Sequence, residues 1–170
     1  MFISSAFAQT APAAAAGGDM QSTLMSMLPL LLMFAVLYFV MIRPQMKKQK
    51  EHRAMIDALA KAKNPIILTG SGVIWSKAWP ELQSFVEKAG VPFYTTPQGR
   101  GVLPDDHPLS FLTMRSSAFR DADLILVIGT RMNYIIGHAA PPRFGANATI
   151  ARIDIDADEI ASAPRKIDIG

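Results

Sequence analysis

The chain has 170 residues, of which half are hydrophobic, and it carries a formal net charge of +3. It contains no cysteine, which excludes disulfides, thiolate metal sites and cysteine nucleophiles. Most of the positive excess comes from the cluster between Arg43 and Lys63, directly after an apolar run. Basic residues in that position are typical of the cytoplasmic side of a membrane helix, so we expect a lipid bilayer rather than a nucleic acid as partner.

The apolar run predicts a transmembrane helix over residues 23–43. No charged residue occurs from Met20 to Ile42, and a helix of that length approaches the roughly 30 Å hydrocarbon thickness of a bilayer. Apart from the terminus, only Asp19 is ionisable before the run, whereas five basic residues follow it: Arg43, Lys47, Lys48, Lys50 and Arg53. The positive-inside rule therefore predicts a single-pass protein with residues 1–22 as a flexible extracytoplasmic tail and a cytoplasmic C-terminal part.

A basic juxtamembrane helix is predicted over residues 44–63. This segment consists of good helix formers, and Met55, Leu59 and Ala62 are spaced to share one face. The basic residues either contact anionic lipid head groups or form a solvated helix face, and both interpretations stay open.

The exit from the apolar run carries a first resemblance, in the sequence FVMIRPQ (residues 39–45) and the lysine-rich stretch that follows. Residues 1–59 resemble YajC, the small single-span accessory subunit of the bacterial Sec preprotein translocase. The resemblance implies the bacterial inner membrane as location and Sec translocase subunits as partners. That family continues into a small β-rich cytoplasmic domain, which is missing here, so we place a fusion seam within 54–63.

Strand and helix patterns alternate over residues 64–170. We expect strands at 66–69, 91–95, 124–128 and 149–155, helices at 77–89 and 111–122, and a short helix starting at Asp156. This order predicts a three-layer α/β domain with a mostly parallel, Rossmann-like sheet, in which ligands bind at the carboxyl ends of the strands. Three segments fall there: 70–72, 129–131 and 154–156. On spacing alone, plain turns and solvated strand ends are the simpler interpretations.

Four sequence blocks in the same order carry a second resemblance: NPIILTGSGV, VPFYTTPQGRGVLPDDHPL, ADLILVIGTRMNY and ARIDIDADEI. Residues 60–170 resemble the middle domain of thiamine-diphosphate-dependent enzymes of the acetolactate synthase, oxalyl-CoA decarboxylase and 2-hydroxyacyl-CoA lyase group. The resemblance implies a possible ADP or FAD site and self-association through this domain. Matched by motif, the cofactor-binding residues are Gly70, Gly72, Arg131, Asp154 and Ile155.

Catalysis in that family belongs to other domains, which supply a glutamate that activates thiamine diphosphate and a GDG-to-NN motif that binds magnesium. We expect neither of those domains in this chain, and therefore no catalytic residue and no metal site, and we expect the α/β domain to be incomplete at its C-terminal end. The three histidines are too far apart for a local metal motif, and Trp75 and Trp79 are expected in a core or an interface.

Three functional hypotheses follow. The chain is a membrane-anchored chimera with a non-catalytic, nucleotide-binding-like domain, a Sec translocase accessory subunit that acts through its span, or a non-functional fusion product.

Overall fold

The computed structural model describes residues 20–170, which form two compact units divided between Lys47 and Lys48. Each unit is described by itself. Residues 1–19 of the predicted extracytoplasmic tail lie outside the described residues.

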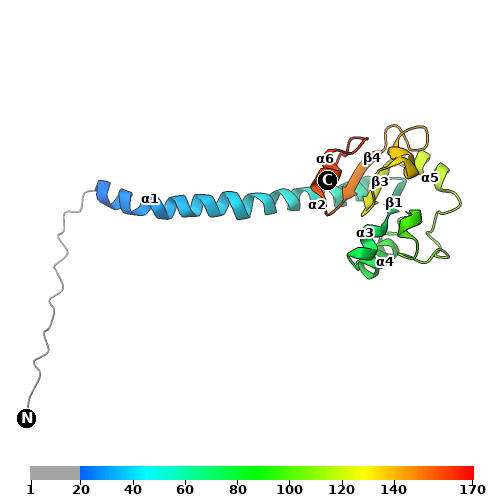
Figure 1. The fold of residues 1–170 in the computed structure, drawn as a ribbon, viewed down its shortest axis with the longest axis horizontal. Coiled ribbons are helices and arrows are strands. Elements are labelled where there is room, and N and C mark those ends of the chain that lie inside the picture. The colour runs from blue at the N-terminus through cyan, green and yellow to red at the C-terminus, as the bar shows by residue number, and fades with distance from the viewer. Residues whose placement is uncertain (1–19) are drawn as a thin grey trace, which may run out of the picture. The chain divides into compact units, whose positions relative to one another are not determined.

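The first unit is helical, as the apolar run predicts. Its segments follow one another without a break: α1 (Met20–Leu37), a π-helical turn (Tyr38–Ile42) and the start of α2 (Arg43–Lys61) (Figure 1). Every residue from 27 to 42 is exposed. Among the described residues, this is the one helix that is long and apolar enough to cross a membrane.

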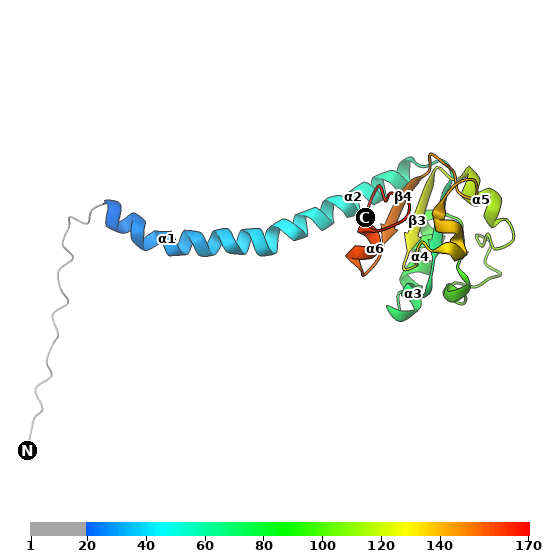
Figure 2. The ribbon, with the colours of Figure 1, turned by 45° about the horizontal axis from the view of Figure 1, so that its top comes forward.

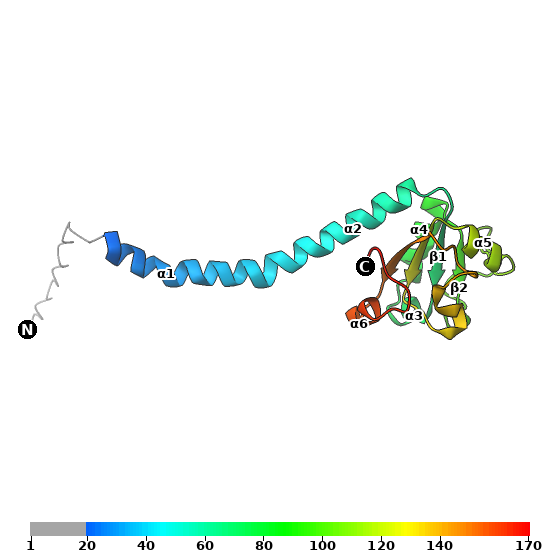
Figure 3. The ribbon, with the colours of Figure 1, turned by 90° about the horizontal axis from the view of Figure 1, so that it is seen from above.

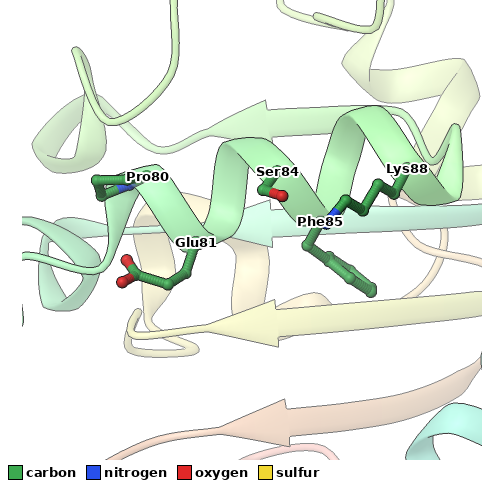
Figure 4. Close-up of a pocket in the computed structure, with 5 residues that line it drawn as sticks. All are labelled: Pro80, Glu81, Ser84, Phe85 and Lys88. Atoms are coloured by element: carbon green, nitrogen blue, oxygen red, sulfur yellow. The ribbon is translucent and has the colours of Figure 1, made fainter.

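The second unit is built on a parallel sheet of four strands in the order β2-β1-β3-β4. Figure 4 shows the four arrows pointing the same way beside α4. The strands are β1 (Pro65–Thr69), β2 (Phe93–Thr95), β3 (Leu124–Ile128) and β4 (Thr149–Ile153). The predicted fourth strand ends two residues early, because the Asp154 side chain accepts a hydrogen bond from the backbone of Asp156 and turns the chain.

Helices cover both faces of this sheet, which confirms the predicted α/β architecture. One face packs against the end of α2, α3 (Ser71–Trp75) and α4 (Trp79–Ala89), and the other against α5 (Arg115–Asp121) and a 3-10 segment (Tyr134–Ala139) (Figures 1 and 2). The last helix is α6 (Ala157–Ala161). The helix predicted at 111–122 starts later, and neither α3 nor the 3-10 segment is predicted by the sequence.

The last turns of α2 belong to the α/β unit. Met55 is only 8% exposed in the core on the α4 side of the sheet, and Ala58, Leu59 and Ala62 pack against the same cluster. This confirms the predicted shared face of Met55, Leu59 and Ala62. The compact unit therefore begins well before residue 64, inside the segment expected to be a juxtamembrane helix.

Asp123 fixes the connection from α2 into β1. Its carboxylate accepts hydrogen bonds from the backbone amides of Lys63 (2.7 Å) and Asn64 (3.0 Å). Slight desolvation raises the pKa of Asp123, but the backbone hydrogen bonds, led by these two, outweigh it and hold the pKa below its usual value.

The C-terminal segment packs along the β4 edge of the sheet. Ile169 forms a parallel bridge with Ala151 on the outer edge of β4. Figure 3 shows the C-terminal segment, in red, beside this strand, in orange. The guanidinium of Arg165 lies within hydrogen-bond distance of four backbone carbonyl oxygens, those of Ala139, Gly145, Ala146 and Ala148. It thereby ties the loop before β4 to the end of the chain.

Candidate functional site

A cleft of about 1200 Å³ opens at the carboxyl ends of β1, β3 and β4. The end of β3 (residues 128–131) lies at its centre, the turn into α3 on one side, and the end of β4 with α6 on the other. After β1 the chain first adds β2 on one side of β1 and later adds β3 on the opposite side of β1. This reversal is the place where open parallel sheets bind ligands.

Four of the five residues singled out in the sequence line this cleft: Gly72, Arg131, Asp154 and Ile155. They come from three different segments and meet because parallel strands end at the same edge. Gly70 is not among the lining residues. It is the residue before α3 and packs behind the cleft against Thr130.

The two glycines after β1 are required by packing. The Gly72 amide donates to the Gly129 carbonyl (2.9 Å) and the Gly70 amide donates to the Ile128 carbonyl (3.0 Å). A Cβ on Gly72 would lie 2.7 Å from Gly129 Cα, and Gly129 itself has a positive φ of 56°. Both glycine amides are thus occupied, and the glycines bring the turn into α3 against the end of β3.

Arg152 organises the opposite wall of the cleft. This arginine is only 1% exposed, and its Nη2 lies 2.8 Å from Asp154 Oδ2, 3.1 Å from Glu159 Oε2 and 3.2 Å from the Thr130 carbonyl oxygen. Its Nη1 donates to the Glu159 carbonyl. A buried charge is tolerated when it is paired and hydrogen-bonded in this way. Arg152 therefore joins the ends of β3 and β4 to α6.

Arg131 faces the same carboxylate from the solvent side. Its side chain is 76% exposed, and its Nε lies 3.0 Å from Glu159 Oε1. Glu159 thus bridges an exposed and a buried guanidinium, one with each carboxylate oxygen. Sequence patterns indicate neither Arg152 nor Glu159 as site residues, because a charge inside a strand and a glutamate in a short helix are usually solvated.

Large apolar side chains stand exposed at the cleft. Trp75, at the end of α3, is 83% exposed, and Ile155, just after β4, is fully exposed, and both line the cleft. Trp79 is 43% exposed as well, so neither tryptophan lies in the core, and of the two expected places, a core or an interface, only the interface stays a prediction. The short α3 turns Trp75 away from the core that holds its neighbour Val73.

A second, shallow hollow lies on the surface of α4. All its lining residues come from that one helix: Pro80, Glu81, Ser84, Phe85 and Lys88 (Figure 4). Because no other element contributes to it, it presents no convergent set of groups for a ligand.

The residues that the structure describes contain no group of three or more metal-ligating side chains. His107 lies in a turn, where its Nδ1 accepts a hydrogen bond from the Leu109 amide.

Comparisons with known families confirm both resemblances, with bounds that differ from the expected ones. Residues 52–170 match the family model of the thiamine pyrophosphate enzyme central domain, and residues 27–74 match the model of YajC, a preprotein translocase subunit. Both models match residues 52–74, where α2 ends and β1 begins.

Individual relatives point the same way. The chain is 38% identical over 112 residues to 2-hydroxyacyl-CoA lyase 1 of Mus musculus, which covers 66% of this chain and 19% of that protein. It is 35% identical over 113 residues to oxalyl-CoA decarboxylase of Escherichia coli K12, covering 66% and 20%. The chain thus spans about a fifth of the length of these curated relatives.

The fold is shared with a solved structure. The crystal structure of a protein described as a thiamin diphosphate-dependent enzyme from Mycobacterium smegmatis superposes with a TM-score of 0.56 at 23% identity, over 73% of this chain and 24% of that one.

Proposed function

Because the chain belongs to the family of thiamine pyrophosphate enzyme central domains and carries a YajC-like region in front of it, we propose that it is a membrane-anchored chimera whose α/β domain binds an adenine nucleotide, ADP or FAD, without catalysing a reaction. The observation that carries the proposal is the convergence of Gly72, Arg131, Asp154 and Ile155 on one cleft at the switch point of the sheet.

The chemistry of the cleft suits the parts of such a ligand. Arg131 has an exposed guanidinium that can pair with a diphosphate, and Asp154 is placed at a strand end, where a carboxylate accepts hydrogen bonds from a ribose. Trp75 and Ile155 offer exposed apolar surface for the planar base. Gly72 keeps the wall beside the end of β3 free of a side chain.

We propose no thiamine-dependent turnover for this chain. The resemblance assigns the cofactor-activating and magnesium-binding motifs to other domains, and the chain spans only about a fifth of the length of its curated relatives. Assays of oxalyl-CoA decarboxylation and 2-hydroxyacyl-CoA cleavage with added thiamine diphosphate and Mg²⁺ should give no rate above background. Turnover at an enzymatic rate would refute this part of the proposal.

Nucleotide binding is tested with the full-length chain in detergent micelles. Trp75 and Trp79 are the only tryptophans, so the variant Trp79→Phe leaves Trp75 as a fluorescent reporter in the cleft. ADP or FAD should change this fluorescence in a saturable way and raise the melting temperature of the α/β domain. At a ligand concentration of 100 times Kd, the expected stabilisation is about 2.7 kcal/mol.

Variants at two arginines separate binding at the cleft from general effects of charge. Arg131→Ala should weaken ADP binding, whereas Arg120→Ala, which removes an exposed arginine from α5 on the other face of the sheet, should not. If neither the Trp75 fluorescence nor the melting temperature changes at saturating ADP and FAD, the nucleotide proposal is refuted.

A second function, that of a Sec translocase accessory subunit, is favoured by the YajC match and by the exposed apolar helix. We propose that this helix is the membrane anchor, in the bacterial inner membrane, with the basic end of the span on the cytoplasmic side. A photo-crosslinking residue in place of Phe34, which is 60% exposed, should give adducts with Sec subunits in intact membranes. The same residue at Ser84 on α4 serves as the control, and absence of adducts at position 34 would remove support for this role.

A further inference from the structure

Glu159 already pairs with Arg131, the residue that the proposed function assigns to the ligand phosphates. The Arg131 Nε lies 3.0 Å from Glu159 Oε1, so the exposed guanidinium already has a carboxylate partner before any ligand arrives. A phosphate that binds Arg131 must take the place of that carboxylate or share the guanidinium with it.

The buried Arg152 holds Glu159 in place on the side away from Arg131. The other carboxylate oxygen of Glu159 lies 3.1 Å from Nη2 of Arg152, which is buried and also contacts the carbonyl of Glu159 and the carboxylate of Asp154. When Arg131 leaves, Glu159 keeps a charged partner and stays in the cleft wall. The carboxylate is therefore a fixed competitor, whereas Arg131, with a side chain that is 76% exposed, is the group free to move.

The charges of these four groups cancel. Arg131 and Arg152 supply two positive charges, and Asp154 and Glu159 supply two negative ones, joined by contacts of 2.8 to 3.1 Å. Asp156, which also lines the cleft, adds a further negative charge. The cleft thus offers no net positive charge to an anion, and a ligand phosphate competes with Glu159 for Arg131.

We propose that Glu159 is a specificity-determining residue of the cleft: fixed by Arg152, it competes for Arg131 and thereby lowers the affinity for ligands with phosphates relative to ligands without them. This inference rests on the proposed nucleotide site. A ligand diphosphate competes with Glu159 for the guanidinium of Arg131, whereas a nucleoside without phosphate leaves the contact between Arg131 and Glu159 in place. The competitor lowers the affinity for the first class only.

The size of the effect follows from the exposure of the pair. Ion pairs at protein surfaces contribute modestly, which corresponds to affinity changes of up to about fivefold. We therefore expect Glu159→Gln to tighten binding of ADP and of inorganic pyrophosphate by about two- to fivefold at low salt. The affinity for adenosine should stay unchanged, and the gain for ADP should shrink as the salt concentration rises.

The test compares Glu159→Gln with the otherwise unmodified full-length chain, both carrying Trp79→Phe, by titration of ADP, pyrophosphate and adenosine, read out through Trp75 fluorescence and calorimetry. The double variant Glu159→Gln with Arg131→Ala distinguishes competition from general repulsion. If Glu159 acts through Arg131, Glu159→Gln gives no gain in the Arg131→Ala background, whereas simple repulsion of the anion would give the same gain in both backgrounds. Equal melting temperatures of the variant and the unmodified chain establish that the fold is kept, and Glu159→Ala provides a second variant if they differ.

The outcomes separate this inference from the proposed function. If the unmodified chain binds ADP and Glu159→Gln binds it no more tightly, the role of Glu159 is refuted and the nucleotide site stands. If only Glu159→Gln binds ADP or pyrophosphate, the competitor is supported and the unmodified chain is not a nucleotide binder. If neither form binds either anion, both proposals fail.

Discussion

The packing of Met55 allows a direct test of whether the end of α2 stabilises the α/β unit. Met55 is 8% exposed, so truncation to alanine removes nearly a whole buried side chain from the core on the α4 side of the sheet. Burial of a methionine side chain stabilises by about 1.5–3 kcal/mol, and the cavity left behind adds to the loss. Met55→Ala should therefore lower the free energy of unfolding of the α/β unit by about 2–3 kcal/mol.

The neighbouring residue provides a matched control. Ile56 is 52% exposed on the same turn of α2, and alanine is a better helix former than isoleucine, so Ile56→Ala should change the stability by less than about 0.5 kcal/mol. Urea denaturation in detergent micelles, followed by tryptophan fluorescence, measures both, because the two tryptophans lie in the α/β unit and none lies in the apolar helix. If Met55→Ala and Ile56→Ala have equal effects, α2 does not pack on the sheet as described.

Three further substitutions probe the ties within the α/β unit. Arg152→Ala should lower the free energy of unfolding by about 3–5 kcal/mol, because it leaves carboxylates in the cleft wall without their buried partner. Arg152→Lys should lower it by less, and circular dichroism melts measure both variants. Arg165→Ala should speed hydrogen exchange in residues 139–148, which lose a guanidinium bound to their carbonyls, whereas the neighbouring Lys166→Ala, at an 87% exposed side chain, should not. The lowered pKa of Asp123 gives a contribution to stability that is complete above its ordinary pKa and is lost as the pH falls through the lower value of the folded state. In acid titrations the stability difference between the unmodified chain and Asp123→Asn should therefore shrink below about pH 4.

The sheet was predictable because its strands have strong local signals. The uninterrupted apolar run from Leu124 to Ile128 is buried over its first four residues, as two-sided coverage by helices requires. By contrast, α3 was missed because Ser71 and Gly72 are typical of a turn, and only the close contact of Gly72 with Gly129 explains why a glycine is needed in that helix. Tertiary packing, rather than helix propensity, decides the structure there.

The candidate site was predictable only in part, for a related reason. Asp154 and Ile155 follow β4 directly and Arg131 comes three residues after β3, so the topology alone brings them to one edge. Arg152 and Glu159 depend on where α6 packs, which no local pattern indicates. The exposure of Trp75 also contradicts the usual preference of tryptophan for buried positions, and it follows from the short length of α3.

The face formed by Met55, Leu59 and Ala62 sets a condition on how two genes can be joined within α2. Each residue added to a helix rotates everything on its far side by about 100°. A join that inserts or deletes one residue between Met55 and β1 would swing the methionine out of the core, whereas a change of seven residues, about two turns, would nearly restore its direction. Whether a recombinant joined within α2 folds therefore depends more on the rotation of Met55 relative to the sheet than on the identity of the residues at the join.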